Sequence, residues 1–261
     1  MTDKTILLPN GWGDDDLSRF QNAAFENELA TYAHVTEWQL LLRDLESVFQ
    51  KCASHAMSGL NKAEEPSTIL LFVTAHNQFL GSVRSTLAGH CLSAYPTGRA
   101  VVESALYCWY LSTNKEAAIR WNNKPVSKNE LRKWGNEFKF SSLTRALQAV
   151  DTPLAVWAAY LHQTAIDFGA HPNKTALYSN MERIQNKDGT VTIRMKVLHE
   201  WNPLSIGTAK FVVEAGMIAI RLFTHGFPEA VQTLNLTQNI ERLARNLTYL
   251  QQTTKMEWPK Y

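Results

Sequence analysis

The sequence has few cysteines and no hydrophobic run long enough to cross a membrane. Its three cysteines, Cys52, Cys91 and Cys108, are too few and too widely spaced for a disulfide framework or a C-x-x-C motif. We interpret them as reduced packing residues, which predicts a reducing compartment. The most apolar windows, 69–73 and 211–223, are shorter than the roughly 20 apolar residues of a membrane span. The N-terminus also lacks the apolar core of a signal peptide, so we expect a cytoplasmic protein with no membrane partner.

Charge of one sign is also not in excess. The chain of 261 residues has 26 Lys and Arg against 24 Asp and Glu, a net charge of +2, which argues against nucleic acid as the partner. Gly-rich phosphate loops, G-x-S-x-G elbows and H-E-x-x-H helices are absent, which removes the commonest nucleotide-binding, hydrolase and zinc-protease assignments. We predict no cofactor. Since 45% of the residues are hydrophobic and 19% are charged, the chain can bury a large core.

Most of the chain has the apolar spacing of amphipathic helices. Residues 17–56 predict two helices or one bent helix, and 69–94 predict a long helix that ends before Pro96. Thr97 is expected to cap a helix over 98–111, which is apolar almost all round and therefore central and buried. Further helices are predicted at 115–122, 128–138, 142–150, 153–169, 204–224 and 228–252.

One segment departs from the helical pattern. Val191, Ile193 and Met195 alternate with polar residues behind the turn 186–189, which predicts a β-hairpin at about 180–198. A lone hairpin is marginally stable in water, so its apolar face should lie on the helices or on another subunit. The second option predicts a homo-oligomer. The fold class is therefore all-α, a multi-helix bundle with a small hairpin insertion, in a single domain over 1–261.

The predicted central helix carries one polar stripe, because Arg99, Glu103 and Tyr107 recur every four residues. Two interpretations stay open. Arg99 and Glu103 can form an ordinary ion pair on a partly exposed face. Alternatively the stripe lines an interior pocket, where Glu103 serves as acid, base or ligand contact and Arg99 binds an anion.

A second candidate segment, 166–173, contains Asp167, His171 and Asn173. An acid in the last helical turn faces the negative end of the helix dipole at a cost of about 0.3 to 1 kcal/mol, so Asp167 is either compensated by a partner or functional. Glu103, Asp167 and His171, with His162 behind them, offer oxygen and nitrogen ligands. The repeated Glu-x-x-His signature of metal-binding bundles is absent, however, and we predict no metal site.

Two short motifs resemble known groups of proteins. Ala94-x(4)-Arg99-x(3)-Glu103 with the later Asp167-x(3)-His171-Pro turn resembles a group of uncharacterised bacterial all-helical proteins. This resemblance covers about residues 70–175 and implies an all-α fold but no activity.

The segment from Arg84 to His90 fits the R-x(4–6)-H pattern and resembles the HEPN-type helical ribonucleases. That resemblance implies metal-independent RNA cleavage at a dimer interface, with His90 as acid or base and Arg84 on the phosphate. On one continuous helix, however, these two side chains point about 120° apart.

Three hypotheses follow. The first is a helical small-ligand-binding or sensor protein whose polar pocket takes its residues from the stripe and from the segment 166–173. Its candidate ligand contacts are Arg99, Glu103, Tyr107, Asp167, His171 and Asn173. The second is a toxin or defence ribonuclease that uses Arg84 and His90. The third is a structural or interaction protein with no ligand.

Overall fold

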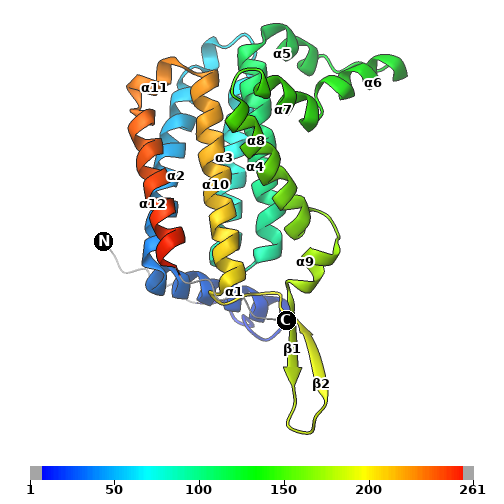
Figure 1. Ribbon diagram of the computed structural model, residues 1–261, viewed down its shortest axis with the longest axis vertical. Coiled ribbons are helices and arrows are strands. Elements are labelled where there is room, and N and C mark those ends of the chain that lie inside the picture. Colours follow the sequence, from blue (N-terminus) through cyan, green and yellow to red (C-terminus); the bar gives the residue numbers. More distant parts are fainter. Residues whose placement is uncertain (1–7, 255–261) are drawn as a thin grey trace.

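The computed structural model describes residues 8–254, which form a helical bundle with one β-hairpin (Figure 1). The fold class is the one expected from the sequence. In chain order, the helices of the described part are α1 (Asp16–His34), α2 (Thr36–Ser58), α3 (Ser67–Leu87), α4 (Cys91–Thr113), α5 (Lys115–Asn122), α6 (Lys128–Glu137), α7 (Phe140–Gln148), α8 (Thr152–Ala165), α9 (Lys174–Tyr178), α10 (Pro203–Gly226), α11 (Glu229–Thr233) and α12 (Leu236–Thr253). A short 3₁₀ turn, η1 (Leu60–Lys62), follows α2, and a π-helical turn, η2 (Ile166–Ala170), follows α8.

Helix α4 is the central helix, packed along both α3 and α10. Val101, Val102 and Leu106 on α4 are fully buried, as the nearly continuous apolar pattern predicts. Gly98 permits the close approach of α10, since a Cβ atom at this position would lie only 2.4 Å from the ring of Phe211. The larger of two buried hydrophobic clusters extends from Trp38 to Leu250 and joins α2, α3, α4, α8, α10 and α12, and the smaller one lies around Leu111 and Phe138.

The prediction of a helix break at Pro96 is wrong. Pro96 lies inside α4, and the break comes earlier, between Leu87 and Cys91. Gly89 has a φ angle of +85° and accepts a hydrogen bond of 2.9 Å from the backbone N–H of His199. This long-range contact and the left-handed glycine end α3, and they outweigh the local preference for a break at proline. Thr97 consequently lies within α4, where its hydroxyl bonds to Ser93 and Ala94, and it caps nothing.

The predicted last helix is also interrupted. Asn235 adopts the left-handed conformation, with φ at +52°, and separates the short α11 from α12. At the other end of the chain, Val35 separates α1 from α2, so the first of the two alternatives for residues 17–56 is confirmed.

The β-hairpin is confirmed, with β1 (Met181–Gln185) antiparallel to β2 (Val191–Met195). It projects from one end of the bundle (Figure 1). The apolar side chains of β2 do not lie on the helices: Ile193 is 63% exposed, and Val191 and Met195 are exposed as well. Within the described part of the chain, these three side chains of β2 therefore stay largely open to solvent.

Two further findings concern membrane-spanning helices and cysteines. Among residues 8–254, no helix is both long enough and apolar enough to span a membrane. All three cysteines are buried and form no disulfide.

Candidate functional site

Arg99 and Glu103 form a partly buried ion pair on α4. Arg99 Nε donates to Glu103 Oε1 over 2.7 Å, the i, i+4 geometry that their spacing predicts. The side chains are 26% and 33% exposed, respectively. The pair thus lies at the edge of the bundle, open on one side.

His162, on α8, contacts the same oxygen of the Glu103 carboxylate. Its Nε2 atom lies 3.0 Å from Glu103 Oε1, across 59 residues of sequence. The ring of Phe140 stacks on the imidazole, with centroids 3.7 Å apart and planes 13° from parallel. Since a carboxylate can only accept, Nε2 of His162 carries the proton and donates it.

Arg99 also reaches His171, in the segment after η2. Its Nη1 atom lies 3.2 Å from His171 Nε2, across 72 residues of sequence. A guanidinium can only donate, so His171 Nε2 accepts, and the ring proton of His171 lies on Nδ1. We refer to Arg99, Glu103, His162 and His171 as the polar cluster.

The surroundings of Glu103 hold its carboxylate in the charged form. Burial acts to raise the pKa of Glu103, but the hydrogen bonds from His162 and Arg99, with the charges of these groups, more than offset burial and leave the pKa below its ordinary value. Glu103 is therefore an anion at neutral pH and acts as a hydrogen-bond acceptor.

The polar cluster leaves several hydrogen-bonding groups for a ligand. Within residues 8–254, no group is bonded to Glu103 Oε2 or to Arg99 Nη2. His171 is exposed and offers Nδ1–H. The cluster therefore presents one anionic acceptor beside two donors, an arrangement suited to a ligand that carries both an anion and a hydrogen-bond donor.

The structure brings together Arg99, Glu103 and His171 but gives the other candidate residues separate contacts. Asp167 is exposed and accepts from Gln163 Nε2 over 2.8 Å. Tyr107 donates its hydroxyl to the backbone carbonyl of Phe138, and its pKa is raised by burial and, to a smaller extent, by Glu103. Asn173 accepts from the N–H of Ala176 and so caps α9. Their contribution to ligand binding stays a prediction.

The acidic and imidazole groups of the polar cluster lie beside a guanidinium. Among the residues that the structure describes, no three His, Cys, Asp or Glu side chains are grouped as metal ligands would be. The Arg99 guanidinium lies between Glu103 and His171, where its charge opposes a cation.

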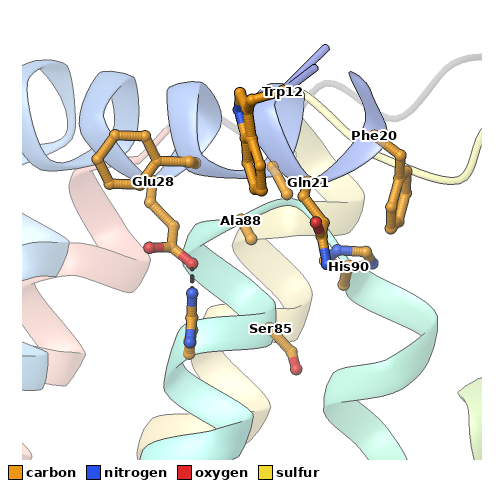
Figure 2. Close-up of a pocket in the computed structure, with 10 residues that line it drawn as sticks. Trp12, Phe20, Gln21, Glu28, Ser85, Ala88 and His90 are labelled. Atoms are coloured by element: carbon orange, nitrogen blue, oxygen red, sulfur yellow. Dashed lines mark hydrogen bonds and ion pairs between the residues drawn. The ribbon is translucent and has the colours of Figure 1, made fainter. Parts of the chain in front are cut away.

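A separate cavity of about 560 Å³ lies between α1 and the junction of α3 with α4 (Figure 2). We call it the α1 cavity. It is lined by Trp12, Phe20, Gln21, Ala24, Phe25, Glu28, Arg84, Ser85, Ala88 and His90. Because α3 ends at Leu87, the premise of one continuous helix is wrong, and Arg84 and His90 both border this cavity.

The polar groups of the α1 cavity are held by residues from α1. Glu28 Oε1 accepts from Arg84 Nε over 3.0 Å, the contact drawn as a dashed line in Figure 2. Phe20 packs edge-on against the ring of His90, with centroids 5.1 Å apart. Burial lowers the pKa of His90, although the charge of Glu28 acts in the opposite direction. The ribonuclease interpretation of Arg84 and His90 stays a prediction.

Two contacts at these sites are difficult to find from the sequence. The sequence suggests His162 beside Glu103 only as a potential metal ligand, and the hydrogen bond between them depends on how α8 packs against α4. Glu28 lies 56 residues before Arg84, and its position at the cavity depends on how α1 crosses the end of α3. There Asn27 and Thr31 donate to the carbonyl oxygens of Ala88 and Leu87, groups that the end of a helix leaves unpaired.

Comparisons with protein-family models, with curated proteins and with solved structures found no match to this chain.

Proposed function

We propose that the protein binds a small polar ligand, of the hydroxy-acid or amino-acid class, at the polar cluster. The observation that carries this proposal is the double contact of Arg99, which bonds both Glu103 and His171. With His162, which reaches Glu103 from α8, three segments distant in sequence place polar groups around this one ion pair. Sites of this kind, where polar groups converge from several elements, are typical of ligand-binding positions.

The groups left at the polar cluster indicate how such a ligand would be oriented. Its carboxylate is expected to accept from Arg99 Nη2, which the contacts to Glu103 and His171 leave without a partner among residues 8–254. Its hydroxyl or ammonium group is expected to donate to Glu103 Oε2. A ligand with only one of these groups would leave half of the site unpaired and bind more weakly.

The proposal is tested by isothermal titration of the protein with lactate, malate, serine and aspartate. We expect at least one of them to bind, and we expect Glu103→Gln to weaken that binding by about ten-fold or more, because the variant lacks the anionic acceptor. Glu137→Gln is the matched control, since Glu137 forms an ion pair with Arg120 in another part of the bundle.

Two results would count against ligand binding at this position. One is the absence of binding for all four compounds. The other is an equal loss of affinity in Glu103→Gln and in Glu137→Gln, which would indicate a general effect on the fold.

We further propose that the protein forms a homodimer through the free edge of β2. Asn186 N donates to Thr190 O over 2.8 Å, and Lys196 N donates to Asn180 O over 2.7 Å. Since bonding positions alternate along an antiparallel strand, Val191, Ile193 and Met195 direct their N–H and C=O groups to the outer edge. Such an edge is a ready template for another strand.

The side chains of β2 are self-complementary. In a symmetric antiparallel pairing centred on Ile193, this residue lies opposite its own copy, and Val191 lies opposite the copy of Met195. These apolar cross-strand pairs are stabilising. The same pairing of β1 would place Arg183 opposite its own copy, and like charges directly opposite are destabilising. The edge of β2 is therefore favoured over that of β1.

A further inference from the structure

The α1 cavity combines exposed aromatic side chains with a charged wall. Phe25, on α1, is 53% exposed, and Trp12 and Phe20 also line the cavity. The volume of about 560 Å³ lies within the range of small-molecule sites. A flat apolar group placed here would remove aromatic surface from water, which is favourable in proportion to the area covered.

Arg84 presents an unused guanidinium fork at this cavity. Its Nε is bonded to Glu28, which fixes the plane of the group. Among residues 8–254, no group is bonded to its Nη1 or Nη2, and the side chain is 78% exposed. Two parallel N–H groups of this kind match the two oxygens of a carboxylate.

The other polar groups limit the net negative charge of a ligand that the cavity can bind. The Glu28 carboxylate balances the charge of Arg84, and His90 gains no charge at neutral pH because burial lowers its pKa. A strand of RNA, with a negative charge at every phosphate, finds no continuous cationic surface here. A single anionic group on an apolar body fits the balance of charge better.

We propose that the α1 cavity binds a small aromatic carboxylate. The aromatic ring is expected to lie among Trp12, Phe20 and Phe25, and the carboxylate to accept from both Nη atoms of Arg84. The neutral imidazole of His90 supplies one further N–H donor at the edge of the cavity. This site is distinct from the polar cluster and does not depend on the function proposed there.

Titration calorimetry with three matched compounds tests the proposal. We expect indole-3-acetate to bind. Indole-3-acetamide has the same shape but no charge, and its affinity should be lower by about ten-fold or more. Acetate, which has the charge but no ring, is expected to show no measurable binding. Equal affinity for the acid and the amide would overturn the role of Arg84.

Variants locate the binding at the cavity. Arg84→Gln should lower the affinity for indole-3-acetate to about that of the amide and leave the amide unaffected. Arg245→Gln, which removes a similarly exposed arginine from α12, is the control and should change the affinity for neither compound. Phe25→Ser should lower the affinity for both compounds. Because Arg84 and Phe25 are exposed, these variants retain the core.

Three results would reject the aromatic carboxylate as the ligand. The first is the absence of indole-3-acetate binding. The second is tighter binding of phenyl phosphate, which would assign the cavity to phosphate esters. The third is cleavage of an RNA oligonucleotide that is lost in His90→Ala, which would assign it to the ribonuclease function. Glu103→Gln should leave indole-3-acetate binding unchanged, so the failure of one proposal is distinguishable from the failure of the other.

Discussion

His76 links the stability of the protein to pH, because burial of its imidazole disfavours the protonated form. The ring lies against Phe49, with centroids 5.0 Å apart. The Glu46 carboxylate is nearby, 3.4 Å from Nε2. Burial lowers the pKa of His76 and outweighs the opposite effect of Glu46.

A histidine with a lowered pKa in the folded chain takes up its proton more readily in the unfolded chain. The free energy of unfolding should therefore be highest above about pH 6.5, the ordinary histidine value, and decrease as the pH falls below it, by at most about 1.4 kcal/mol per pH unit for one group. We expect His76→Leu to reduce this slope in urea unfolding between about pH 7.5 and pH 5.

Part of the slope should remain in His76→Leu, because burial also lowers the pKa of His90 and of His199. His34→Gln removes an exposed histidine and serves as the control. The same slope in the parent and in His76→Leu would contradict the expectation.

The polar cluster could be predicted only in part. The spacing of Arg99 and Glu103 indicates an ion pair, and the chemistry of the segment 166–173 draws attention to His171. Helical periodicity determines which residues share a face but not what that face contacts. The contact of His162 with Glu103 depends on how α8 packs against α4. For the same reason Asp167, which looked unfavourable at the end of its helix, lies in solvent with Gln163 as its partner.

At the scale of elements, the junction of α3 with α4 is determined by long-range contacts and not by the local preference of proline for a helix end. Proline is the stronger local signal for a helix end, yet α4 continues through Pro96. Gly89, which the apolar pattern includes in a helix, has instead a positive φ because the chain at His199 comes close. A Cβ atom at position 89 would lie 2.2 Å from the carbonyl oxygen of His199.

This geometry makes position 89 intolerant of side chains. Gly89→Ala should lower the free energy of unfolding by about 2 kcal/mol or more, since it adds a strained φ to a clash with the backbone. Gly81→Ala is the matched control. Gly81 lies inside α3 with no neighbouring atom near its Cβ position, so alanine there should stabilise the helix by about 0.5 to 1 kcal/mol. Urea unfolding of both variants at neutral pH measures the difference.

Equal stabilities of Gly89→Ala and Gly81→Ala would show that the junction is not constrained as the structure indicates. The helices on either side of the junction were predictable, because an apolar stripe persists over many turns. The turns between them were less so, since Gly89 and Asn235 take left-handed conformations that depend on contacts from distant parts of the chain.

At the scale of the whole molecule, α4 separates the two proposed ligand positions. His90 precedes the first turn of α4, and Arg99 lies about 13 Å further along its axis. Each position has its own arginine paired with its own carboxylate, Glu28 for Arg84 and Glu103 for Arg99. Since the two positions share no contact residue, variants at one should not alter binding at the other.

The hairpin projects from the bundle, and packing on the bundle does not account for its stability. A two-stranded hairpin with an exposed apolar face is marginally stable alone, and pairing through β2 would give a four-stranded sheet across a dimer axis. We expect sedimentation velocity to show a monomer–dimer equilibrium that depends on protein concentration. Ile193→Lys should shift it to monomer, because two lysines would then lie opposite each other at the axis.

Val126→Lys is the control for this change. Val126 is 96% exposed in the segment between α5 and α6, far from the hairpin in the sequence, and the variant adds the same charge and should leave the equilibrium unchanged. A parent protein that remains monomeric at every concentration would reject the dimer. A dimer that persists in Ile193→Lys would place the interface away from the edge of β2. The hairpin would then need another explanation for its exposed apolar face, such as a partner of a different kind.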